Sequence, residues 1–66
     1  LPATEQIAHE VVIQRRDLAP SVERIMDAEL SDDQRNLAMT MFRDSLTQDG
    51  DPNRDPRVAI ATAASA

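Results

Sequence analysis

The stretch SDDQRNLAMTMFRDSL, residues 31–46, predicts a helix from its first residue onward and decides the fold. Ser31 and Gln34 have the spacing of a capping box, in which each side chain accepts a hydrogen bond from the other residue's backbone N–H. Asp32 and Asp33 then place negative charge at the positive end of the helix dipole. The residues that follow at helical spacing form a broad apolar face: Leu37, Ala38, Met41, Phe42 and Leu46.

The same reasoning predicts helices on both sides of this stretch. The four expected helices span about residues 4–17, 20–30, 32–48 and 56–65. Pro20 separates the first two, because proline fits the first turn of a helix but not its interior. Thr4 and Asp17 are the expected N-cap residues of these two helices. Each helix carries its apolar residues on one side, as a packed bundle requires.

The last predicted helix begins at Asp55 and Pro56, an N-cap residue followed by a proline at the first helical position. Its only large apolar anchors are Val58 and Ile60, so we expect it to dock weakly. No stretch alternates apolar and polar residues as a half-buried strand does. The sequence therefore predicts a single all-α domain over residues 1–66, a small bundle of three short helices with a weaker C-terminal fourth helix.

The length of the chain limits how it can be stabilised. A chain of 66 residues buries only about 60% of the surface that its unfolded form exposes, so its core is thin. The sequence contains no cysteine, which excludes disulfides and cysteine-ligated metals. Tight helix packing, a metal bound without cysteine, oligomerisation or a bound partner remain as sources of stability.

The composition is acidic and limits the partners that we expect. Twelve acidic residues face seven basic ones, all of them arginine, and the net charge is −5. Phosphates of nucleic acids and anionic membranes repel such a chain, and no apolar run is long enough to cross a bilayer. We therefore expect neither nucleic acid nor a membrane as partner, and a cytoplasmic location. Arginine without lysine, together with many alanines, suggests a bacterial or phage origin.

Residues 49–56, DGDPNRDP, carry oxygen ligands at every second position, as calcium-binding loops do. The candidate ligands are Asp49, Asp51, Asn53 and Asp55. The resemblance to an EF-hand loop fails at Arg54 and Ile60, where that loop needs a glycine and a bidentate glutamate. We therefore expect a turn between helices, without metal or cofactor. A degenerate EF-hand-like calcium-binding module remains an alternative.

No pattern of side chains predicts catalysis. A nucleophile needs a positioned base, and the only histidine, His9, lies opposite the apolar face of its helix, with no hydroxyl group suitably spaced from it. We therefore expect no enzyme. Another alternative is a small DNA-associated transcriptional regulator, since residues 5–26 have the length of a helix-turn-helix. The turn glycine is missing, however, and Arg15 and Arg16 form only a small basic patch.

Spare apolar residues point to contact with another protein. Ile13 and Met39 fall outside the inward faces of their helices, and with Met26 and Met41 they are the predicted partner-binding residues. Methionine suits adaptable interfaces because its side chain is flexible and polarizable. The sequence therefore predicts a non-catalytic helical protein–protein interaction module: an oligomerisation unit, an adaptor or a small regulator. We expect it to bind a protein partner, to form a homo-oligomer, or both.

Overall fold

Short helices follow one another through the computed structural model, which describes residues 3–49 and 55–66. The elements are α1 (Thr4–Gln14), the 3₁₀ turn η1 (Arg16–Leu18), α2 (Ala19–Asp27), α3 (Asp32–Asp49) and α4 (Pro56–Ala64). The described residues contain no strand. The predicted all-α bundle with a fourth helix at the C-terminal end is therefore confirmed.

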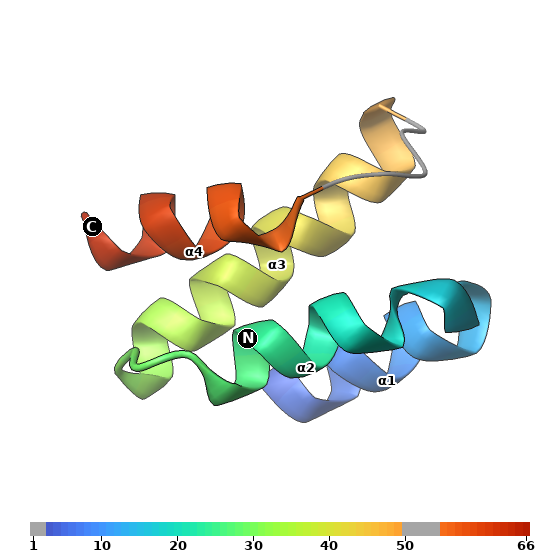
Figure 1. The fold of residues 1–66 in the computed structure, drawn as a ribbon, viewed down its shortest axis with the longest axis horizontal. Coiled ribbons are helices and arrows are strands. Elements are labelled where there is room, and N and C mark those ends of the chain that lie inside the picture. The colour runs from blue at the N-terminus through green and yellow to red at the C-terminus, as the bar shows by residue number, and fades with distance from the viewer. Residues whose placement is uncertain (1–2, 50–54) are drawn as a thin grey trace.

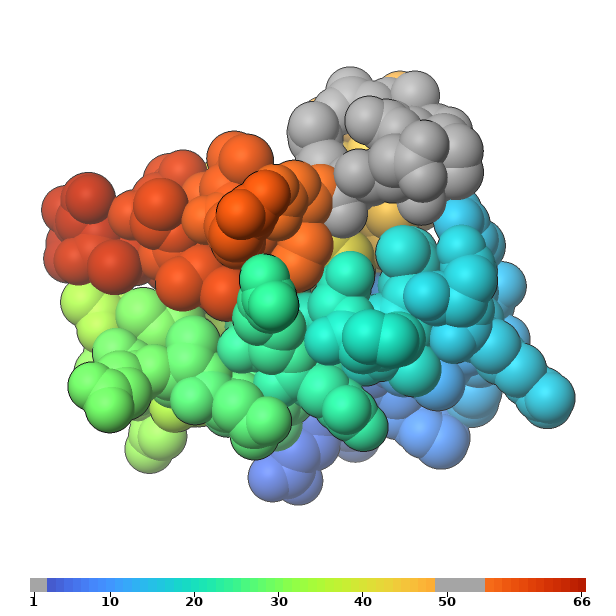
Figure 2. Space-filling view, in the orientation of Figure 1, coloured from blue at the N-terminus to red at the C-terminus, as the bar shows by residue number. Residues whose placement is uncertain are grey.

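The central element is α3, which packs against each of the other three α-helices. The pair α1 and α2 lies along one side of the molecule, and α4 lies across α3 and also contacts α2 (Figure 1). Figure 2, in the same orientation, shows α2 and α4 in front, with most of α3 behind them. In this arrangement α1 and α4 approach α3 from different directions.

The core of the described residues is entirely apolar. Its largest fully buried side chains are Phe42, Ile7, Ile25 and Met39. Smaller or slightly more exposed side chains complete it: Ala8, Val11, Leu18, Val22, Ala38, Ala59 and Ala63. Burying a large apolar side chain stabilises the fold by about 1.5–3 kcal/mol. The predicted burial of Phe42 is confirmed, since only 1% of its surface is exposed.

Two residues of α3 have the opposite burial from the one expected. Met39 is fully buried, whereas Leu37 is 38% exposed. The prediction assumed one apolar stripe with Leu37 in it, but contacts with three other helices bury a different arc of α3, one that includes Met39. The expectation that Met39 is exposed is therefore wrong. Its role in binding a partner stays a prediction.

Docking of α4 depends on small residues. Pro56, Ala59 and Ala63 are buried, Ile60 is partly buried, and Val58 is 59% exposed. Alanine leaves room for two helix backbones to approach each other closely, so this side of α4 packs on α3 and α2. The expectation that Val58 anchors the helix is wrong, because Val58 lies on another side of α4.

Two predicted helix caps are confirmed. The N–H of Ser31 donates to Oε1 of Gln34 at 3.0 Å, and the N–H of Gln34 donates to Oγ of Ser31 at 3.2 Å. The N–H of Arg57 donates to Oδ1 of Asp55 at 2.9 Å, which caps α4. Each cap satisfies a backbone donor that the first turn of a helix leaves without a partner.

The predicted cap at Thr4 is wrong. Ala3 is the N-cap residue of α1, and no side chain caps this end. The hydroxyl oxygen of Thr4 instead accepts a hydrogen bond from Nδ2 of Asn36 at 3.0 Å. The Thr4 side chain thus links the first turn of α1 to α3, a contact that local sequence does not predict.

The predicted cap at Asp17 is also wrong. The chain leaves the α conformation at Arg15, whose φ and ψ are −138° and 83°, and α2 has Leu18 as its N-cap residue. The break precedes Pro20, whose ring would clash with the carbonyl of Arg16 in a continuous helix. The carboxylate of Asp17 accepts hydrogen bonds from the Arg15 guanidinium instead.

Arg35 connects the end of α2 to α3. Its Nη1 donates to the carbonyls of Ile25 at 2.9 Å, Met26 at 2.6 Å and Ala28 at 2.8 Å, and its Nη2 donates to the carbonyl of Leu30 at 3.0 Å. The last carbonyls of a helix lack intrahelical partners and carry the negative end of its dipole. The guanidinium therefore caps the C-terminal end of α2 and fixes the connection to α3.

Candidate functional site

The four predicted partner-binding residues do not form one surface. Ile13 is 63% exposed on α1, as expected. Met39 lies in the core, while Met26 on α2 and Met41 on α3 are partly buried against it. Three different helices thus carry these side chains, and only Ile13 is a fully exposed member of the set.

The outward face of α3 gathers apolar and acidic side chains. Leu37 and Met41 are four residues apart, which places them one turn apart on the same side of the helix. Asp33 lies one turn before Leu37, and Asp44 lies nearly one turn after Met41. This side of α3 therefore has a pair of large apolar residues with a carboxylate beyond each end.

The first turn of α4 extends this apolar surface. Val58 and Met41 line one shallow groove of about 70 Å³ between α3 and α4. Because Met41 belongs both to this groove and to the outward side of α3, it connects Val58 with Leu37. We call the set of Leu37, Met41 and Val58 the outer patch.

A wider, open groove lies beside Leu37, between the first turns of α1 and α3. It has a volume of about 640 Å³ and is lined by Ala3, Thr4, Asp32, Asp33, Asn36, Leu37 and Thr40. The charged residues in this described lining are both acids, Asp32 and Asp33, and both are exposed. The outer patch thus borders a groove of negative charge.

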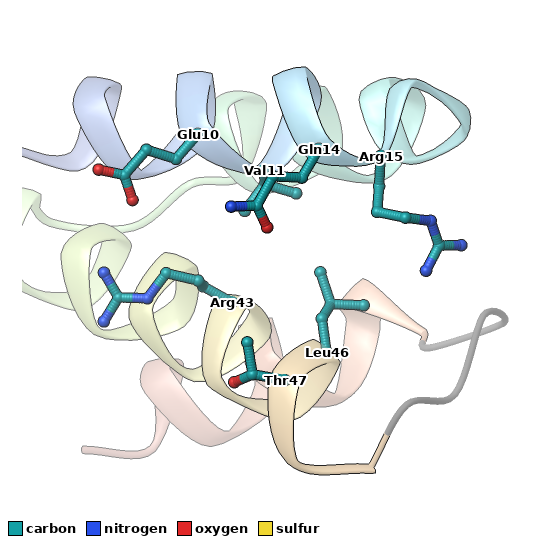
Figure 3. A pocket seen from close by; sticks show the side chains of 7 residues that line it. All are labelled: Glu10, Val11, Gln14, Arg15, Arg43, Leu46 and Thr47. Carbon is teal, nitrogen blue, oxygen red and sulfur yellow. The ribbon is translucent and has the colours of Figure 1, made fainter.

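A separate cleft of about 360 Å³ lies between α1 and the later turns of α3 (Figure 3). It is lined by Glu10, Val11, Gln14, Arg15, Arg43, Leu46 and Thr47. Figure 3 shows Val11 and Leu46 projecting from the two helices into the space between them, with the arginines at opposite ends. The Gln14 amide also lies in the middle of the cleft, and Glu10 lies at the same end as Arg43, so the cleft is lined by a mixture of apolar, polar and charged groups.

The charges of this cleft are balanced by acids on the same helices or beside them. Nε and Nη2 of Arg15 donate to the Asp17 carboxylate at 3.0 and 2.7 Å, and Arg43 donates to Oδ1 of Asp44 at 3.3 and 3.2 Å. The first pair of hydrogen bonds raises the pKa of Arg15 and lowers that of Asp17. With Glu10 also present, the cleft offers little net attraction for an anion.

The calcium hypothesis falls mostly outside the described residues. The side chains of Asp49, Asp51 and Asn53 are not among them, so this alternative stays a prediction. Asp55 is described, and its carboxylate accepts hydrogen bonds from Nε and Nη2 of Arg57 and from the Arg57 backbone, which together lower its pKa. Within residues 3–49 and 55–66, no group of three or more histidine or acidic side chains is arranged to hold a metal ion.

Comparison of the chain with known protein families, with curated proteins and with solved structures finds no match. In the part of the chain that the structure describes, no helix combines the length and the apolar character needed to cross a membrane. The candidate site therefore depends on the geometry of this molecule alone.

Sequence reasoning missed two members of the outer patch as contact residues. Leu37 and Val58 were both expected to pack inward, because each is a large apolar residue in a predicted helix. The available signal was the spacing of Ala59 and Ala63, which places two small residues on one side of α4, and the structure buries both.

Proposed function

We propose that this chain is a non-catalytic helical module that acts by protein–protein contact. The observation that carries the proposal is the outer patch, where Leu37 and Val58 stay exposed beside Met41 although the core is filled without them. An apolar centre with polar or charged residues around it is the usual anatomy of a protein interface. Asp33 and Asp44 supply such a rim on α3.

The small size of the chain supports the same proposal. A domain of this length has little core to spare, and contact with another protein adds buried apolar surface to it. The partner is either a second copy of the chain or a different protein, and Ile13 offers a further apolar contact on α1. Both arrangements fit an oligomerisation unit, an adaptor or a small regulator.

The arrangement of the arginines favours protein contact over DNA binding. Arg15, Arg43 and Arg57 each pair with a neighbouring aspartate, and Arg35 donates to backbone carbonyls. Affinity for DNA comes largely from cationic side chains that are free to neutralise phosphates. Four of the seven arginines are thus already engaged within the protein.

Site-specific crosslinking in the source cells tests the proposal. The photoreactive residue p-benzoylphenylalanine replaces Ile13, Leu37 or Val58, one at a time, and Glu23 serves as an exposed control on α2. We expect covalent protein adducts at one or more of the apolar positions and none at Glu23. The mass of the adduct distinguishes a dimer of this chain from a complex with another protein. Absence of adducts at all three apolar positions would contradict the proposal.

A further inference from the structure

We infer that the outer patch binds an amphipathic helix of a basic partner protein. This inference rests on the proposed function and adds the surface and the chemistry of the partner. It uses Leu37, Met41 and Val58 as the apolar contacts, and the acids beside them as the source of charge selectivity.

The shape of the surface favours a helix as the bound element. The Cβ atoms of residues four apart on a helix are about 5–6 Å apart, so Leu37 and Met41 form a short ridge along α3. Apolar residues at the same spacing on a second helix pack against such a ridge. A peptide that binds by strand addition would need a free strand edge for its backbone hydrogen bonds, and the described residues contain no strand.

The charge around the patch favours a basic partner. Asp32 and Asp33 are exposed in the groove beside Leu37, and neither pairs with an arginine within the described residues. The positive end of the α3 dipole offsets only about half a unit of charge, against two carboxylates. Lysine or arginine on the polar side of a bound helix would therefore meet a net negative rim.

The same charges disfavour a second copy as the occupant. In a two-fold symmetric dimer both sides of the interface present this same surface, so Asp32 and Asp33 of each copy would add four carboxylates to one interface. Like charges facing each other across an interface cost affinity. The net charge of −5 adds to this repulsion.

A designed peptide tests the inference directly. The probe is an amphipathic helix of about four turns with leucines on one side and lysines on the other, and its control carries glutamate in place of every lysine. Titration into the ¹⁵N-labelled protein, followed by NMR, reports which amides respond. We expect the lysine peptide to shift resonances around Leu37, Met41 and Val58 and to leave those around Ile13 unchanged.

Matched substitutions then separate the patch from other exposed apolar residues. Leu37→Gln combined with Val58→Gln should weaken binding of the lysine peptide at least about tenfold. Ile13→Gln removes an exposed apolar side chain elsewhere and should leave the affinity within about twofold. Asp32→Asn with Asp33→Asn should lower both the affinity and its dependence on salt, with circular dichroism recording the helix content.

Several results would overturn the inference. They are shifts confined to the region of Ile13, equal binding of the glutamate peptide, no binding of the lysine peptide, or a dimer of the chain that Leu37→Gln dissociates. Crosslinks at position 13 together with failure of the peptide would leave the proposed function standing and remove only this inference. Absence of every crosslink would remove the proposed function itself.

Discussion

The inner and outer faces of α3 carry similar side chains and differ in what surrounds them. Met39 and Phe42 on the inner face are fully buried, whereas Leu37 on the outer face is exposed and Met41 lies at its edge. The difference shows that apolar character alone does not separate core residues from contact residues. The directions from which neighbouring helices approach decide which apolar residues are buried.

The largest expected effect is on the inner face. Phe42→Ala removes the only aromatic ring of the chain from the core and should lower the free energy of unfolding by about 3–5 kcal/mol. This loss is comparable to the whole stability of a domain of this size. Urea denaturation followed by circular dichroism measures it. A variant that melts within a few degrees of the unmodified protein would show that Phe42 does not hold the inner face together.

The two methionines allow the same substitution on both faces. Met39→Gln places an amide in the apolar core and should cost about 2–4 kcal/mol, through lost apolar burial and unsatisfied hydrogen-bonding groups. Met41→Gln, at a partly exposed position, should cost about 1 kcal/mol or less. Equal losses in thermal or urea unfolding would erase the distinction between the two faces.

Arg35 tests whether a polar side chain also belongs to the stabilising part of α3. Arg35→Met keeps the apolar stem but removes the donors to four backbone carbonyls, and should cost about 1.5–3 kcal/mol. Arg16→Met is the matched control, because Arg16 is exposed, and should change stability by less than about 0.5 kcal/mol. Similar melting temperatures for both variants would mean that the cap on α2 is dispensable.

Acid should weaken the exposed ion pairs and leave the burial of the side chains on the two faces of α3 unchanged. The pKa values of Asp17 and Asp55 lie below the ordinary value of 3.8, because arginine hydrogen bonds favour the charged carboxylates. Each group therefore contributes stability that is present above that pH and is lost as pH falls through its lowered pKa. We expect the melting temperature to fall in this range, and Asp55→Asn to reduce the fall. If the melting temperature of the Asp55→Asn variant fell with pH as much as that of the unmodified protein, the pair of Asp55 and Arg57 would not contribute to the acid sensitivity.

Local features of the fold were predictable from the sequence. The capping box at Ser31 and Gln34 and the start of α4 at Asp55 depend on residues within one turn, and the structure confirms them. The clustering of apolar residues around Phe42 likewise indicated that Phe42 is a core residue, and its burial confirms this. Spacing within one segment is sufficient information for these features.

Features that depend on how helices pack were not predictable in the same way. The bonds from Arg35 reach the end of a different helix, and the exposure of Leu37 depends on where α1 and α4 lie. Of the outer patch, only Met41 was among the predicted contact residues, and the exposure of Ile13 elsewhere was also foreseen. The outer patch required knowing that α4 docks through Ala59 and Ala63, which leaves Val58 outside.

One measurement tests most directly whether the outer face of α3 serves contact and not stability. The variant with Leu37→Gln and Val58→Gln is assayed for its free energy of unfolding and for binding of the lysine peptide. We predict a stability within about 1 kcal/mol of the unmodified protein, because both side chains are exposed, together with at least roughly tenfold weaker binding. A loss of several kcal/mol, or unchanged binding by a stably folded variant, would contradict the account.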